Sequence, residues 1–133
     1  MTRTSTSLDA PMARAEAAAA PVLDLVHLSR QSLGDRGLEV ELLRLFDAQA
    51  AQVIGRLTSG AGRAERRWRA DLAHTLKGSA LAVGAGAVAA EAASFENALY
   101  GESGEAELER RLAALSDAVA TVRARIADLL QDA

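Results

Sequence analysis

The stretch LERRLAALSDAVATVRARIADLL, residues 108–130, contains the most regular hydrophobic repeat of the chain. Its apolar residues recur at intervals of three and four: Leu108, Leu112, Leu115, Val119, Val122, Ile126, and then Leu129 or Leu130. Residues spaced in this way share one face of an α-helix, because the helix repeats every 3.6 residues. The stretch therefore predicts an amphipathic helix of about six turns that buries one face.

Three segments upstream have the same periodicity, and glycine-rich breaks separate them. They run over about 38–57, about 64–83, and from Val88 to Leu99. Their predicted buried stripes are Leu42, Leu45, Phe46, Gln49, Val53 and Leu57 in the first, Trp68, Leu72, Leu76, Ser79 and Val83 in the second, and Val88, Ala92, Phe95 and Leu99 in the third. We expect four long amphipathic helices joined by short loops, which is the pattern of an antiparallel bundle.

A shorter helix should precede these four. Asp24 lies near its expected start, Leu25, Leu28 and Leu33 are its apolar residues, and a turn-like cluster at 34–37 ends it. No segment alternates with a period of two, as strands do. The predicted fold is therefore all-α, an antiparallel four-helix bundle with a short additional N-terminal helix, over residues 22–133. Residues 1–21, rich in Thr, Ser and Ala, are predicted to be a flexible tail.

Composition narrows the classes of partner and site. The net charge of -3 and pI near 5.4 argue against general nucleic-acid binding, which needs a basic face. The chain has no cysteine and two histidines, a poor basis for a metal site. No apolar run approaches the roughly 20 residues that span a bilayer. We expect a soluble, cytoplasmic protein without membrane contact, and a monomer, because the face of 108–130 completes its own bundle.

His74 is predicted to lie on the side of its helix opposite the buried face. On a helical wheel with His74 at zero, Leu72, Leu76 and Val83 lie between roughly 160° and 200°, so the ring should point to solvent. Lys77 lies about 60° to one side and Gly78 about 40° to the other. Leu81 lies about 20° from the His74 line, two turns further on, and should also face solvent.

Each of these residue types suits the acceptance of a phosphoryl group. An exposed imidazole is mostly neutral near neutral pH and keeps a lone pair for attack on phosphorus. A lysine one turn away can partly neutralise phosphoryl oxygens. Gly78 within a helix costs about 1 kcal/mol relative to alanine, which makes sense if a partner must approach the backbone there. An exposed Leu81 suits a docking surface.

From these residues alone the functional interpretation stays open. A lone surface histidine is most often only a surface residue, and a glycine in a helix sometimes only eases packing. His27 is an even weaker candidate, because it lies beside the apolar positions of a short helix without charged or small companions at matching spacing.

The run HTLKGSALAVG, from His74 to Gly84, resembles the signature of histidine phosphotransfer (HPt) domains. That signature is roughly His-x-Leu-Lys-Gly-Ser-[Ala/Ser], followed by a glycine a few residues later. The resemblance continues more weakly at Val88, Ala92 and Phe95-Glu96, and upstream at Leu42–Phe46, so that about residues 22–130 are covered. The sequence departs at Ala82, where many members are polar, and at Glu91, where many are apolar.

The resemblance implies that His74 is the phosphoacceptor, that Lys77 steadies the phosphoryl oxygens, and that Gly78 clears space for the partner. It implies a phosphorelay protein of a two-component system, which accepts a phosphoryl group from a phospho-aspartyl receiver or a kinase and passes it to the aspartate of a response-regulator receiver. The partners implied are receiver domains and a sensor or hybrid histidine kinase. Such a domain is a carrier rather than an enzyme; it has no cofactor of its own, and Mg²⁺ belongs to the receiver. The sequence contains no Gly-x-x-x-x-Gly-Lys-[Ser/Thr] loop for ATP.

Other interpretations remain. The dimerisation domain of a sensor kinase also carries a helical histidine, but it usually reads His-Glu-[Leu/Phe]-[Arg/Lys]-x-Pro, and here Thr75 follows the histidine. The HPt-like front domain of a chemotaxis kinase has a compatible motif. The main alternative is a non-catalytic helical bundle that binds a receiver without phosphotransfer, although the presence of both His74 and Lys77 argues against it.

Overall fold

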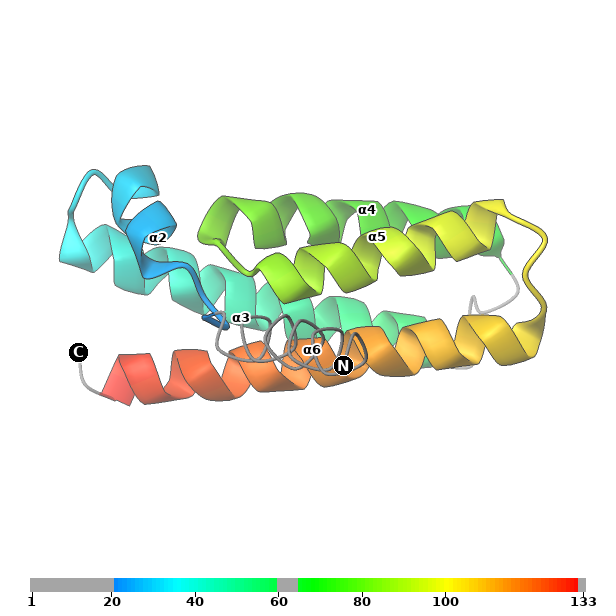
Figure 1. Ribbon diagram of the computed structural model, residues 1–133. Coiled ribbons are helices and arrows are strands. Elements are labelled where there is room, and N and C mark those ends of the chain that lie inside the picture. The colour runs from blue at the N-terminus through cyan, green and yellow to red at the C-terminus, as the bar shows by residue number, and fades with distance from the viewer. Residues whose placement is uncertain (1–20, 60–64, 132–133) are drawn as a thin grey trace, which may run out of the picture.

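The computed structural model describes residues 21–59 and 65–131. Over this part the chain forms only α-helices and the loops between them (Figure 1). The four long helices run alternately up and down, and the short α2 packs at one end, against the C-terminal part of α4 (Figure 1). The predicted fold, an all-α antiparallel four-helix bundle with a short additional N-terminal helix, is confirmed. The helices are α2 (Leu25–Gln31), α3 (Arg36–Thr58), α4 (Arg66–Val83), α5 (Gly86–Tyr100) and α6 (Glu105–Gln131).

The predicted buried face of α6 is confirmed at every position. Its residues Leu108, Leu112, Leu115, Val119, Val122 and Ile126 are buried, and Leu129 and Leu130 pack partly buried against the core. On α5 the predicted Val88, Ala92, Phe95 and Leu99 are buried as well. The hydrophobic repeat predicted these buried faces correctly because large apolar side chains occupy one face of each helix.

The predicted stripe on α4 is only partly correct. Leu76 and Val83 are buried, but Trp68, Leu72 and Ser79 are half-buried. The fully buried positions of α4 also include Arg69, Ala70, Ala73 and Ala80. The reason is that α4 makes its most extensive contact with α5, along alanines whose small side chains let the two helices approach closely.

The predicted stripe on α3 is also partly wrong. Phe46, Val53 and Leu57 are buried, but Leu45 is 60 % exposed, and Leu42 and Gln49 are half-buried. The core instead takes Leu43 and Ala50. Four of the five residues 42–46 are apolar, so the sequence pattern is compatible with more than one buried face of α3. The packing of α3 against both α4 and α6 determines which of these residues are buried.

The short helix α2 is confirmed, and of the three apolar residues assigned to it, one belongs to the core. Leu28 is buried, whereas Leu25 is 43 % exposed and Leu33 is 91 % exposed. Leu33 follows the end of the helix, at a positive φ of 56°. Leu23, just before the helix, enters the core instead.

Capping and a close backbone contact hold α2 in place. The Asp24 carboxylate accepts a hydrogen bond from the His27 backbone N–H (3.0 Å), and the Asp24 N–H donates to the Gly84 carbonyl oxygen (2.9 Å). Gly84 ends α4 at φ 82°, and a Cβ there would lie 2.9 Å from the Asp24 carbonyl oxygen. Only glycine fits both the left-handed backbone and this contact.

The predicted flexible tail over 1–21 lies outside the described residues except for Pro21. Ala64, the expected start of the segment over about 64–83, lies outside them too. In residues 21–59 and 65–131 no helix is both long and apolar enough to cross a membrane.

Candidate functional site

His74 lies in the middle of α4, and its side chain is 66 % exposed. It therefore points to solvent, as the helical wheel predicted. Ala73 and Leu76, which are close to His74 in the sequence, are fully buried. The packed side of α4 is therefore the side opposite the His74 ring. The histidine thus projects from a rigid, packed helix rather than from a loop.

One edge of the His74 ring is bound to a carboxylate on the neighbouring helix. His74 Nδ1 lies 3.1 Å from Glu96 Oε2 and 3.4 Å from Glu96 Oε1. Because an ionised carboxylate can only accept hydrogen bonds, the proton of this bond belongs to Nδ1. In the neutral ring Nε2 then keeps its lone pair.

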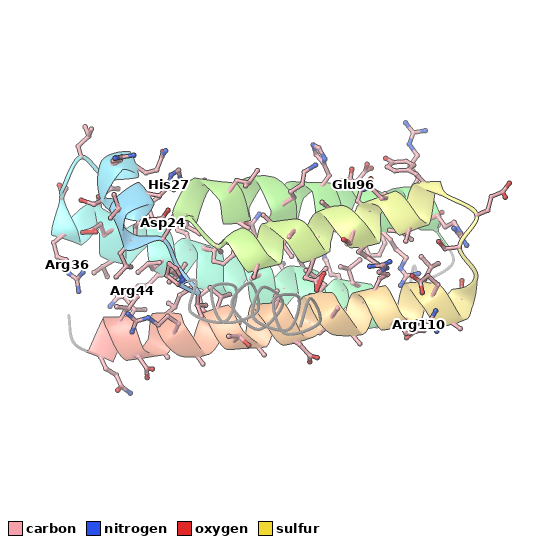
Figure 2. All side chains as sticks on the ribbon, in the orientation of Figure 1. Asp24, His27, Arg36, Arg44, Glu96 and Arg110 are labelled. Carbon is pink, nitrogen blue, oxygen red and sulfur yellow. The ribbon has the colours of Figure 1, made fainter. Side chains whose placement is uncertain are left out.

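Glu96 was not among the predicted site residues. It comes from α5 (Figure 2), and its side chain is only 13 % exposed and lies within reach of the His74 and Lys77 side chains of α4. A wheel drawn for one helix cannot show a neighbour from another helix. The available signal was the pair Phe95-Glu96, which resembles an apolar residue and a glutamate of HPt domains.

Lys77 shares this carboxylate. Its Nζ lies 3.5 Å from Glu96 Oε1, and its side chain is 31 % exposed. The sequence predicted Lys77 on the same patch as His74, and the structure brings both side chains to one carboxylate. A cation with a flexible stem can leave such a half-exposed pair for a stronger anion nearby.

Gly78 lies one turn from His74, and the packing of the described residues does not require a glycine at this position. A Cβ built there would meet no side chain or other helix within 4 Å. The same is true of Gly55 in the last turn of α3. A methyl group at Gly78 would therefore project into open space on the His74 face.

Leu81 is 56 % exposed on the same face of α4, so its predicted orientation is confirmed. It borders a cleft of about 380 Å³ where α2 meets the turn between α4 and α5. A second, mostly apolar groove of about 180 Å³ lies between α3 and α4 and includes the exposed Leu45. His74 is thus flanked by apolar surface toward the α2 end of the bundle.

His27 stands apart from this site. It lines the cleft beside Leu81, and its Nε2 atom is buried with no hydrogen-bond partner among the described residues. Figure 2 places it with Asp24 at the end of the bundle, away from Glu96. Within the described residues no group of three or more His, Cys, Asp or Glu side chains is arranged to hold a metal ion.

Comparisons with known proteins identify the family and the fold of the chain. Residues 41–132 match the model of the Hpt domain family. The crystal structure of the HPT domain from an Hpt sensor hybrid histidine kinase of Shewanella is similar, with a TM-score of 0.71, 17 % identity, and coverage of 84 % of this chain and 96 % of that chain. At this identity the likeness establishes the fold alone. A search of curated proteins gave no significant match. Because the family match spans most of the sequence, the chain belongs to the Hpt domain family, which serves phosphotransfer in two-component signalling.

Proposed function

We propose that this protein accepts a phosphoryl group on Nε2 of His74 from a phospho-aspartyl receiver domain or a kinase, and passes it to the aspartate of a response-regulator receiver. The observation that supports this most directly is the state of the His74 ring. Its side chain is 66 % exposed, and Nδ1 is engaged by Glu96, so that the accessible nitrogen is Nε2.

The transfer step needs only one nucleophile from this chain. The Nε2 lone pair attacks phosphorus in line, the N–P bond forms, and the P–O bond to the donor carboxylate breaks, leaving its electron pair on the aspartate. Positive charge develops on the imidazole during this step. Glu96, 3.1 Å from Nδ1, stabilises that charge by a charge-assisted hydrogen bond.

Lys77 and Gly78 would help the partner's phosphoryl group to reach His74. As the phosphoryl group arrives with close to two negative charges, the Lys77 ammonium turns from Glu96 toward its oxygens. Gly78 leaves room for the partner's active site to approach the α4 backbone. Mg²⁺ and the remaining charge stabilisation come from the receiver, and the chain acts as a phosphocarrier without ATP chemistry of its own.

Leu81 belongs to the docking surface in this proposal. It lies on the His74 face, and the groove with Leu45 extends the apolar area onto α3. Apolar area beside a reactive group allows a partner to bury surface while its aspartate reaches Nε2. His74, Gly78, Leu81 and Leu45 would then contact the same receiver.

A reconstituted transfer reaction tests the proposal. The protein is incubated with a phosphorylated receiver and Mg²⁺, and we expect acid-labile phosphate on the wild type but none on His74→Gln. The chain has one other histidine, so His27→Gln is a matched control that should still be phosphorylated. Phosphate on His74→Gln would show that the site assignment is wrong.

The same reaction separates transfer from simple binding. If the protein binds the receiver but never gains phosphate, the non-catalytic bundle is the better description. The pairing of Lys77 with the carboxylate that holds His74 favours transfer, because a binding surface has no need of an oriented, chargeable imidazole.

A further inference from the structure

Arg69 is a charged residue in the core of the bundle. It lies on α4, its exposed fraction is 0 %, and it is the largest fully buried side chain of residues 21–59 and 65–131. Its guanidinium carbon lies 5.3 Å from the centre of the Phe95 ring, which is also fully buried on α5. This distance is typical of a cation–π contact.

Burying an arginine side chain in a core costs free energy of folding. Removing its charge from water is unfavourable, and apolar residues of similar volume often give equal or greater stability. Its presence therefore suggests a purpose other than stability. The ring that Arg69 contacts suggests what this purpose is, because Phe95 immediately precedes Glu96, the residue that holds His74.

Arg66 of α4 donates hydrogen bonds to the carbonyl oxygens of Leu99 and Gly101 at the C-terminal end of α5, but the middle of the contact between the two helices is rich in small side chains. Much of it consists of buried alanines: Ala70, Ala73 and Ala80 on α4, and Ala89 and Ala92 on α5. Small side chains bring helices together but offer shallow ridges. A carboxylate lies on the order of 6 Å from its helix axis, so a rotation of about 20° would move it by about 2 Å. That movement would break the 3.1 Å bond from His74 to Glu96.

We propose that Arg69 is a positioning residue, whose stack on Phe95 sets the rotation of α5 and thereby holds Glu96 against Nδ1 of His74. The effect on phosphotransfer rests on the function proposed above, but the effect on the His74 ring does not. Arg69 acts through Phe95 and Glu96 and need not touch the phosphoryl group.

The ring itself provides the first test. In ¹⁵N spectra of the neutral imidazole, the wild type should show His74 protonated mainly on Nδ1, as the bond to Glu96 requires. Arg69→Met should shift His74 toward a mixture of tautomers, while Arg69→Lys, which keeps a cation beside the ring, should restore most of the Nδ1 signal. Ile126→Val, a core change on α6, is the control that should leave the signal unchanged.

A double-mutant cycle provides the second test. In the wild type, Glu96→Gln should slow transfer about tenfold, whereas in the Arg69→Met background the same change should slow it by less than about threefold, because Glu96 no longer meets His74 there. Thermal unfolding checks that each variant is folded. If Arg69→Met does not fold, Phe95→Leu removes the stack from the other side.

A folded Arg69→Met or Phe95→Leu protein with the wild-type tautomer would overturn the proposal, as would an undiminished effect of Glu96→Gln. Failure of transfer in the wild type, together with the expected tautomer change in Arg69→Met, would instead contradict the proposed function and leave the positioning role intact.

Discussion

At the scale of single residues, the site depends on one hydrogen bond between two helices. In the transfer that we propose, His74 supplies the nitrogen nucleophile, and the hydrogen bond from Nδ1 to Glu96 leaves Nε2 as the available ring nitrogen. Lys77 is paired with the same carboxylate and is therefore held within reach of a group bound to the ring. Three side chains on two helices are thus placed for the proposed roles of nucleophile, orienting anion and mobile cation.

Glu96→Gln tests the orienting anion. The amide oxygen can still accept the Nδ1–H bond, but it no longer stabilises positive charge on the ring, so the initial rate of phosphotransfer should fall about tenfold. Stability should change by less than about 1 kcal/mol, since the carboxylate's ion pairs reach the surface. Glu91→Gln on the same helix is the matched control. An unchanged rate in Glu96→Gln would contradict the role proposed for this carboxylate.

At the scale of the helix, α4 carries a glycine that its own fold does not require. Gly78→Ala should raise the free energy of unfolding by about 0.5–1 kcal/mol, because alanine is the better helix former and the added methyl meets no other group. It should also slow phosphotransfer at least about fivefold, because the methyl stands in the partner's path.

Gly55→Ala on α3 separates these two effects. Gly55 is also exposed within a helix, with no contact waiting for a Cβ. Gly55→Ala should also raise stability in denaturant unfolding, by less than Gly78→Ala because Gly55 lies in the last turn of α3, and it should leave the transfer rate unchanged. Equal transfer rates for the two variants would mean that Gly78 does not clear space for the partner.

The end of α4 requires its glycine for a different reason. Gly84→Ala should destabilise the protein, because alanine disfavours φ 82° and its Cβ would clash with the Asp24 backbone at 2.9 Å. Gly34→Ala is the matched control, with φ 78° and open space around the new methyl. In thermal or denaturant unfolding, Gly84→Ala should lose about 1 kcal/mol more than Gly34→Ala. Equal losses would mean that the contact between α2 and α4 is loose.

At the scale of the whole molecule, most exposed large apolar side chains gather at one end of the bundle. Among the described residues these include Leu25, Val26, Leu38, Leu45 and Leu81, with Tyr100 as the exception toward the other end. Leu81 joins this area to His74. The exposed imidazole therefore lies toward an apolar surface, which we propose as the surface that orients the receiver.

Leu81→Arg tests this surface. Because Leu81 is 56 % exposed, the change should alter stability by no more than about 0.5 kcal/mol. Transfer from a phosphorylated receiver should slow at least about tenfold, since a charge replaces apolar contact area. Ala120→Arg adds the same charge on the exposed face of α6 and should have little effect. A large loss of stability in Leu81→Arg would mean that this side chain supports the core.

The amino-acid sequence alone determined the helices, the buried face of α6 and the outward direction of His74, Gly78 and Leu81. These properties follow from helical geometry, which is local: the angle between residues along one helix does not depend on what packs beside it. Only the tertiary structure decided that Glu96 meets His74, that Arg69 is buried under Phe95, and that Leu45 is exposed while Leu43 is buried. Each of these depends on which helices are neighbours and on how each helix is rotated about its axis. A helix face made largely of alanines does not reveal that rotation in the sequence.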